Sequence, residues 1–248
     1  MSTGLADFYE AGYTQADPER AALLGRWRAH GADLKAGHIT TLCARAGRAP
    51  RSVIEIGCGD GALLSALAAR GFAVSYDGFE LSEPAALLAR DRNIPGAGRI
   101  ESFDGSRVPA GDATYDLAVL SHVLEHVPDP LSLLREAARV ARAVLVEVPL
   151  EHNRSAARPH KRAEARGIGH IQAFDRADIH ALATAAGLRV FGELTDPLPV
   201  THHAFFAASP AERVKGRLKW GIRTAVWRAA PQRAERLFTV HHAALLGR

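Results

Sequence analysis

The stretch from Val53 to Gly61 constrains the fold more than any other part of this chain. It reads Val-Ile-Glu-Ile-Gly-Cys-Gly-Asp-Gly, an apolar run that ends in three glycines at alternate positions. A helical pattern rich in alanine and leucine follows directly. This order predicts a buried parallel strand, a tight turn and the start of a helix. The glycines leave no Cβ in the way of a ligand, and the helix N-terminus offers unpaired N–H groups to a polar or anionic group.

Apolar, β-branched segments alternate with helical segments along the centre of the chain. The predicted strands are 52–56, 73–80, 99–103, 115–120, 143–148 and 188–194. The predicted helices between them are 61–70, 85–90, 130–139 and 176–186. This alternation predicts a parallel sheet with helices on both faces. Ligands of such sheets bind beyond the carboxyl ends of the strands, where the strand order reverses.

The two ends of the chain extend this pattern. A helix is expected from Pro18 towards Ala46, with an interruption near Gly31. Residues 211–229 form a basic helical segment, and residues 236–246 are expected to form a final strand. The basic helix would therefore be inserted before the last strand.

Composition limits the class of protein. The 248 residues suffice for one large α/β domain, and the net charge of +4 is modest, although a pI of 9.4 leaves nucleic acid binding open. Two cysteines, Cys43 and Cys58, make no disulfide framework. The N-terminus lacks a signal-peptide pattern, and no apolar run is long enough to cross a bilayer. These features predict a cytoplasmic protein.

The glycine turn by itself fits more than one cofactor. Gly57, Gly59 and Ala62 match the dinucleotide fingerprint, which allows alanine at its last position. Glu80 ends the second predicted strand, where a carboxylate can accept both hydroxyls of a ribose. Asp104 follows the third predicted strand, where it could accept a hydrogen bond from an exocyclic amine such as that of adenine.

A polar cluster at residues 121–130 follows the fourth predicted strand, where a ligand is expected. Four segments, in this order and spacing, resemble the class I S-adenosylmethionine-dependent methyltransferases and, within them, the small-molecule branch that includes quinone-biosynthesis enzymes. They are Glu55-x-Gly57-x-Gly59-x-Gly61, Phe79-Glu80-Leu81-Ser82, Tyr115-Asp116-Leu117 and Leu124-Glu125-His126-Val127. Residues 147–151 and 169–171 also resemble segments of that branch. The similarity covers about residues 50–195.

The resemblance implies a Rossmann-like, doubly wound and mostly parallel sheet of seven strands, with the last strand antiparallel and a helical cap at the N-terminus. The whole chain, 1–248, would form a single methyltransferase domain. Its parts would be a helical cap in 1–48, a cofactor-binding core in 49–196, and a basic amphipathic helix plus final strand in 197–248. No nucleic acid is expected as substrate, because Ser-His-Val at 121–123 replaces the Asn/Asp-Pro-Pro-Tyr/Phe segment of base-methylating members.

The resemblance also implies S-adenosylmethionine as the cofactor and a set of residues that hold it. These residues are Glu55, Gly57, Cys58, Gly59, Glu80, Leu81, Asp104, Gly105, Ser121 and His122. The turn at 57–59 would pack against the methionine part, and Glu55 would place its amino group. Glu80 would bind the ribose hydroxyls and Asp104 the adenine amine. Residues 121–122 would line the methionine side below the methyl group.

Methyl transfer makes modest demands on the protein, because the sulfonium is already activated. The site must align the nucleophile with the methyl group and exclude water, and a neutral nucleophile benefits from a general base, most often histidine. His170 and His152 lie past the fifth predicted strand, at the expected rim, and are the candidate bases. Glu125 and His126 are expected to hold the following loop, and Asp77 is a rival for the ribose role.

Three other polar features bear on ligands and partners. Neighbours on a strand point to opposite faces, so the adjacent histidines at 202–203 and 241–242 predict no metal site. The basic segment 152–167 is expected to be a solvated loop rather than a lid for an acidic substrate. The helix at 211–229 would either cover its own domain as a lid or lie on an anionic membrane.

The sequence therefore predicts an S-adenosylmethionine-dependent methyltransferase that acts on a small-molecule acceptor, for which a lipid-like or aromatic compound would suit either role of the basic helix. Two alternatives stay open. One is an NAD(P)-dependent oxidoreductase, since the glycine turn also fits that cofactor. The other is a non-catalytic, membrane-peripheral module with a methyltransferase-like fold.

Overall fold

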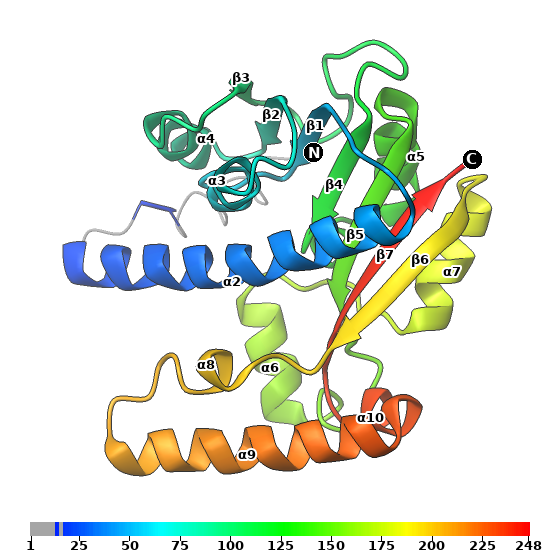
Figure 1. Ribbon diagram of the computed structural model, residues 1–248. Coiled ribbons are helices and arrows are strands. Elements are labelled where there is room, and N and C mark those ends of the chain that lie inside the picture. The colour runs from blue at the N-terminus through cyan, green and yellow to red at the C-terminus, as the bar shows by residue number, and fades with distance from the viewer. Residues whose placement is uncertain (1–12, 15–16) are drawn as a thin grey trace.

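The computed structural model describes residues 13–14 and 17–248, which contain one seven-stranded sheet (Figure 1). Its strands are β1 (Ser52–Ile56), β2 (Ser75–Glu80), β3 (Ala97–Ser102), β4 (Leu117–Ser121), β5 (Ala143–Pro149), β6 (Arg189–Asp196) and β7 (His241–Gly247). They lie in the order β3-β2-β1-β4-β5-β7-β6. β7 pairs antiparallel with both neighbours, and every other pair is parallel. The predicted Rossmann-like topology with an antiparallel last strand is confirmed.

Helices cover both faces of the sheet. They are α2 (Pro18–Arg45), α3 (Ala62–Ala69), α4 (Glu83–Asp91), α5 (Pro130–Val140), α6 (Pro159–Gly167), α7 (Arg176–Ala185), α8 (Val200–His203), α9 (Pro210–Ala229) and α10 (Pro231–Leu237). A short 3₁₀ turn, η1 (Leu124–His126), follows β4. Side chains of α2 and α3 share a hydrophobic core with one face of the sheet, and those of α5 and α7 share one with the other face. Within the described part of the chain, no helix is long and apolar enough to cross a membrane.

Three details of the sequence prediction were wrong. The helix α2 continues through Gly31, because one glycine costs a helix only about 1 kcal/mol and the following turns are buried against the sheet. The last strand begins at His241 rather than at Arg236, because Pro231 starts the short helix α10. The basic segment folds from Pro159 into the helix α6, although none of its side chains is buried.

The turn between β1 and α3 requires glycine at its alternate positions. Gly57, Gly59 and Gly61 have φ angles of 81°, 53° and 73°. A Cβ on Gly57 would lie 2.6 Å from Cγ2 of Val123, and a Cβ on Gly61 would lie 2.9 Å from that of Ala89. The absence of side chains therefore lets this turn pack closely against both the segment after β4 and the helix α4.

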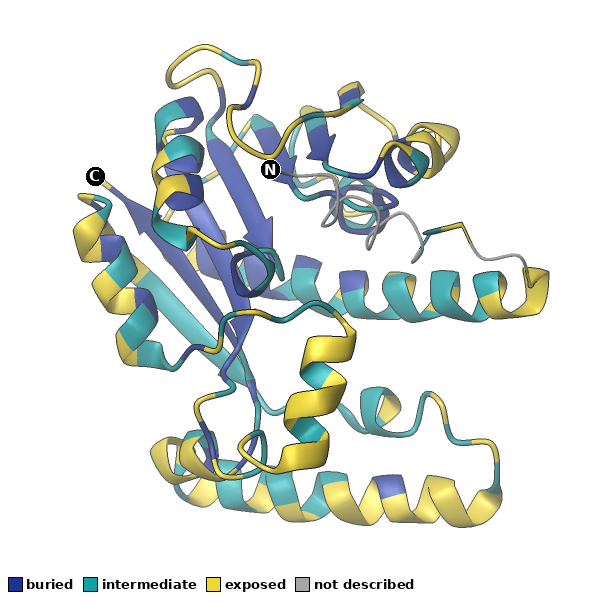
Figure 2. Ribbon diagram, turned by 180° about the vertical axis from the view of Figure 1, so that it is seen from behind, coloured by how far each residue is buried: buried dark blue, intermediate teal, exposed yellow. Residues whose placement is uncertain are grey.

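The C-terminal helices extend the molecule beyond the carboxyl ends of the parallel strands. In Figure 1, α6, α8, α9 and α10 form a layer below the sheet, and β6 and β7 reach from the sheet into this layer. The helix α2 lies between that layer and the turn that follows β1. Figure 2 shows that α6 and much of α9 are exposed, in contrast to the buried strands β4 and β5.

Candidate active site

A cavity of about 460 Å³ opens at the carboxyl ends of β1, β4 and β5. The helix α2 contributes Trp27, Arg28 and Lys35 to its wall, and the glycine turn, the loops after β4 and β5, α8 and β7 contribute the rest. This is the edge at which parallel α/β sheets bind ligands. A larger hollow of about 1010 Å³ between α7 and α10 contains none of the predicted cofactor residues.

Part of the predicted cofactor set lines the smaller cavity. The residues in its wall are Glu55, Gly57, Cys58, Gly59, Ser121 and His122. Glu80, Leu81, Asp104 and Gly105 lie outside the wall. Glu55 is only 3% exposed, its Oε2 has no hydrogen-bond partner among the described residues, and burial raises its pKa well above the usual value. An unpaired buried carboxyl group is costly, so this atom is suited to receive a cationic or hydrogen-donating ligand.

Glu80 holds the glycine turn against the end of β2. Its Oε2 accepts a hydrogen bond from the backbone N–H of Gly59 at 2.8 Å. Its Oε1 accepts from the N–H groups of Leu81 and Ser82 at 2.9 and 3.1 Å. Burial raises the pKa of Glu80, and these N–H donors oppose that rise by favouring the ionised form. Each carboxylate oxygen still has acceptor capacity for a further donor.

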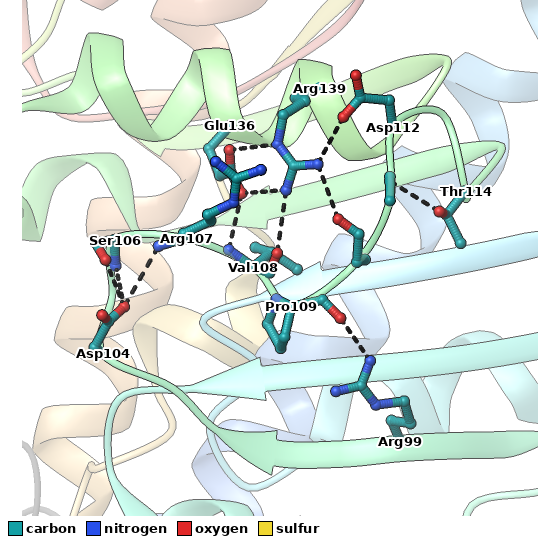
Figure 3. Close-up of polar contacts among 12 residues, drawn as sticks. Arg99, Asp104, Ser106, Arg107, Val108, Pro109, Asp112, Thr114, Glu136 and Arg139 are labelled. Carbon is teal, nitrogen blue, oxygen red and sulfur yellow. Dashed lines mark hydrogen bonds and ion pairs between the residues drawn. The ribbon is translucent and has the colours of Figure 1, made fainter.

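Asp104 is turned into its own loop (Figure 3). Its Oδ1 accepts from the N–H and the hydroxyl of Ser106 at 2.8 and 2.6 Å, and these bonds lower its pKa. The rival for the ribose role, Asp77, accepts from the hydroxyl of Tyr115 at 2.5 Å and from the N–H of Arg99 at 2.8 Å. Both aspartates therefore hold local structure and do not line the cavity.

Four residues at the glycine turn were not predicted from the sequence. Asp60 binds Nε of Arg28 at 2.8 Å and Nη2 of Arg92 at 2.7 Å, which ties the turn to α2 and to the end of α4. The guanidinium of Arg28 also lies 4.9 Å from the ring centre of Tyr13. Only Asp60, within the motif itself, gave any sequence signal, because Arg28 and Tyr13 come from the N-terminal segment.

The two predicted bases lie in different places. His170 lines the cavity, and its Nδ1 lies 2.8 Å from Oε2 of Glu151. Burial would lower the pKa of His170, but the bond to Glu151 raises it overall. His152 lines the larger hollow instead, where its half-exposed ring lies 2.9 Å from Asp178. The structure therefore brings only His170 to the cavity.

Aromatic rings and further histidines complete the wall. Trp27 and His202 both line the cavity, and their ring centres lie 4.2 Å apart. Phe205 and Phe206 lie outside the wall, and the ring centre of each is 4.9 Å from that of Trp27. His241, which begins β7, also lines the cavity. These side chains come from α2, from α8 and the segment after it, and from β7, and they form an aromatic cluster that no single sequence segment indicated.

The described part of the chain contains three groups of histidine and carboxylate side chains, and within each group the ligand atoms lie within 4.8 Å of one another. They are His122-Glu147-His241, Glu125-His126-His170 and His152-Asp175-Asp178. His122 and His126 have the His-x-x-x-His spacing that can hold a metal, but the structure separates them into different groups. The sequence analysis placed the pair at 202–203 on a strand, whereas both residues end the helix α8. These distances would permit a cation, and the absence of a metal site stays a prediction.

Comparison with known sequences identifies the family. A family described as "Methyltransferase domain" matches residues 27–192. Two curated relatives are named ubiquinone biosynthesis O-methyltransferase. That of Thiobacillus denitrificans is 36% identical over 104 residues, which cover 40% of this chain and 43% of the relative. That of Nitrosomonas europaea is 32% identical over 101 residues, which cover 39% and 42%. The chain spans about half the length of the curated relatives it matches.

Solved structures share the fold at low sequence identity. Phospholethanolamine N-methyltransferase 2 of Haemonchus contortus, in complex with phosphomonomethylethanolamine and S-adenosylhomocysteine, has a TM-score of 0.65 at 12% identity and covers 98% of this chain and 60% of that chain. The [4+2]-cyclase SpnF has a TM-score of 0.59 at 17% identity, with 87% and 81% covered. A shared fold does not define an activity.

The sheet order, with its antiparallel last strand, is that of the Rossmann-like methyltransferase fold. The chain belongs to the methyltransferase domain family, and S-adenosylmethionine is the cofactor that this membership indicates. The family match favours this cofactor over the dinucleotide that the glycine turn also fitted.

Proposed function

We propose that the cavity binds S-adenosylmethionine and transfers its methyl group to a small-molecule acceptor. The observation that carries this proposal is that Oε2 of Glu55 has no hydrogen-bond partner among the described residues and lies beside a turn with glycine at alternate positions. Glu55 would receive the amino group of the cofactor, and Arg28 would meet its carboxylate. Glu80 would accept the ribose hydroxyls with the lone pairs that its backbone donors leave free. For Asp104 to reach the adenine amine, its loop would have to turn towards the cavity.

The bound cofactor supplies a methyl carbon that the sulfonium has already activated. The residues of the chain would then hold the acceptor in line and keep water out. Trp27 and His202 in the cavity wall support an apolar or planar acceptor, because their rings offer broad contact surfaces. The names of the curated relatives favour an oxygen atom as the nucleophile.

Calorimetry with S-adenosylhomocysteine, and with NADH in parallel, tests this proposal. We expect the wild type to bind S-adenosylhomocysteine and not NADH. Glu55→Gln keeps the shape but removes the charge, and should weaken binding by about 1–3 kcal/mol. Glu101→Gln, on the exposed strand β3, is the matched control and should bind as the wild type does. Binding of NADH alone would overturn the proposal. If S-adenosylhomocysteine binds as expected, a screen with tritium-labelled S-adenosylmethionine would identify the acceptor.

We also propose that α9 contacts an anionic membrane surface. Val214, Leu218 and Ile222 recur on successive turns and are 54%, 63% and 67% exposed. Arg213, Lys215, Arg217 and Lys219 flank this apolar stripe. The protein covers α9 elsewhere, since Gly216 packs against the backbone of α8 and Val226 and Trp227 pack against the core. An exposed apolar stripe with basic neighbours fits the interface of an anionic bilayer better than a lid that closes on its own domain.

Sedimentation with vesicles tests this contact. The wild type should bind phosphatidylglycerol vesicles at low salt and bind phosphatidylcholine vesicles much less. Leu218→Glu should abolish binding, because it places a charge in the centre of the stripe. Leu87→Glu, at an exposed leucine of α4, is the matched control. Equal binding by the two variants would show that α9 is not the contact.

A further inference from the structure

Glu147, the charged residue of β5, is fully buried and surrounded by imidazole groups. Its Oε1 lies 3.1 Å from Nδ1 of His38 on α2 and 3.7 Å from Nδ1 of His241 on β7. A ring nitrogen of His122, after β4, lies within 4.8 Å of the nearest polar atoms of both Glu147 and His241. Nε2 of His38 lies 3.0 Å from Oδ2 of Asp196 on β6. Segments far apart in the sequence therefore converge on one carboxylate.

This arrangement keeps Glu147 ionised inside the protein. Burial alone would raise its pKa, but its interactions with His241 and His38 hold the pKa well below the usual range. Burial would likewise lower the pKa of His38, but its bonds to Asp196 and Glu147 raise it to about 9. At neutral pH an imidazolium therefore lies between two carboxylates, and the negative charge of Glu147 remains available to His241.

The histidines in the cavity wall differ in their ability to accept a proton. Burial lowers the pKa of His202 to about 3 and that of His122 well below its ordinary value, so both are weak bases. A neighbouring carboxylate raises the pKa of His170, which therefore keeps its proton to higher pH. His241 lines the cavity and directs Nδ1 towards Glu147, which leaves Nε2 for a ligand.

We propose that His241 is the general base for the methyl acceptor, that Glu147 orients its ring, and that His38 holds Glu147 in place. The proposal rests on the methyl transfer proposed above. As a lone pair of the acceptor hydroxyl forms the new bond to the methyl carbon, the hydroxyl proton moves to Nε2 of His241. The electron pair of the broken carbon–sulfur bond stays on sulfur, which leaves neutral S-adenosylhomocysteine. The imidazolium later gives its proton to water, and Glu147 stabilises it until then.

The pair can be tested without cofactor or acceptor. The titratable and charged groups that surround His241 are Glu147 of β5, His122 after β4, His202 of α8, Asp196 of β6, and Lys35 and His38 of α2. In histidine-selective NMR spectra of the ligand-free protein, Glu147→Gln should shift the ring resonances of His241, because the carboxylate of Glu147 lies 3.7 Å from its Nδ1. His180, paired with Glu193 outside the cavity, is the internal control and should not move. Unchanged ring resonances of His241 would overturn the orienting role.

Turnover supplies the second test, with tritium-labelled S-adenosylmethionine and catechol as the probe acceptor. His241→Asn should lower kcat by about 10²–10⁴-fold and leave the Kd for S-adenosylhomocysteine within about twofold. Glu147→Gln should lower kcat less and move the acidic limb of the pH profile to lower pH, because the base loses a charge that favours its protonated form. His180→Asn should behave as the wild type does.

Three results would overturn the assignment of the base. One is a wild-type rate in His241→Asn. Another is a loss of activity on addition of EDTA that is restored by a divalent cation. That result would indicate that His122, Glu147 and His241 act as metal ligands. The third is a wild type that binds S-adenosylhomocysteine but methylates nothing. A wild type that does not bind S-adenosylhomocysteine would instead refute the proposed function. The NMR test of the contact between Glu147 and His241 does not depend on that outcome.

Discussion

The two sides of the cavity are built in different ways. On the glycine-turn side, Glu55 and residues 57–60 come from one continuous segment, and Glu80 closes it from the neighbouring strand. On the histidine side, His122 after β4 and His241 of β7 line the cavity, and Glu147 of β5 and His38 of α2 adjoin them outside its wall. The first side is a local motif in which backbone geometry decides, whereas the second is an assembly of buried charges that exists only after the chain has folded.

The largest effect on stability is expected on the histidine side. Replacing His38 by leucine removes the imidazole partner of Asp196 Oδ2 and one partner of the buried Glu147. The free energy of unfolding should fall by about 3–5 kcal/mol, as measured by urea denaturation at neutral pH. Asp33→Asn, which affects an exposed ion pair with Arg70, should cost less than about 1 kcal/mol. Similar losses in both variants would show that the buried cluster contributes no more than a surface pair.

The pH dependence of stability sharpens the same contrast. The pKa of His38 rises from 6.5 to about 9 on folding, because its bonds to Asp196 and Glu147 outweigh the effect of burial. The stabilisation is therefore complete below about pH 6.5 and is lost as pH rises through about 9, by roughly 3 kcal/mol. His38→Leu should lack this loss over the same window. A wild type whose stability stays constant there would contradict the raised pKa.

A smaller effect on stability is expected at the glycine turn, where the strain is local. Gly57→Ala places a Cβ at a φ of 81° and 2.6 Å from Cγ2 of Val123, and should cost about 1–3 kcal/mol and weaken binding of S-adenosylhomocysteine. Gly25→Ala, within α2 and with open space at its Cβ, should instead stabilise by about 0.5–1 kcal/mol. Thermal unfolding distinguishes the two, and equal shifts would mean that the turn can relax.

The smallest effect should come from Asp104, although its position in the sequence matches that of an adenine-binding residue. Glu80→Gln should weaken binding of S-adenosylhomocysteine by about 1–2 kcal/mol, because Glu80 also holds Gly59. Asp104→Asn should change binding by less than about 0.3 kcal/mol, because this exposed side chain bonds only within its own loop. Calorimetry measures both. An equal loss in Asp104→Asn would show that the loop turns towards the cofactor, as the sequence analysis predicted.

Periodic features were readable from the sequence. The apolar strands and the alternating helices predicted the parallel sheet, whereas the antiparallel last strand was implied by the resemblance to the methyltransferase family. Short charged segments were harder to interpret, because α6 and α10 lack an apolar stripe that would separate a helix from a loop. The order of strands and helices can thus be predicted from hydrophobic periodicity, whereas the formation of short exposed helices depends on their tertiary surroundings.

The residues of the site also differ in whether the sequence predicts them. Glu55 and the glycine turn could be predicted because their function depends on neighbours in the chain. Glu147 stood out as the charged residue of an apolar strand, but nothing local links it to His38, which precedes it on α2, or to His241, which follows on β7. Only tertiary structure reveals which imidazole faces a buried carboxylate, and the direction of each pKa shift depends on that contact.

The insertion of β7 between β5 and β6 also has a consequence for how the chain matures. The strand β6 has no partner in the sheet except β7, and α8, α9 and α10 are synthesised between the two. During translation, the edge of β5 and the whole of β6 have no strand partner until β7 emerges, and unpaired edges can form hydrogen bonds with other chains. The part of the cavity wall that contains His241 is therefore the last part of the molecule to form. A chain interrupted before β7 would keep unpaired strand edges exposed after its glycine turn had folded.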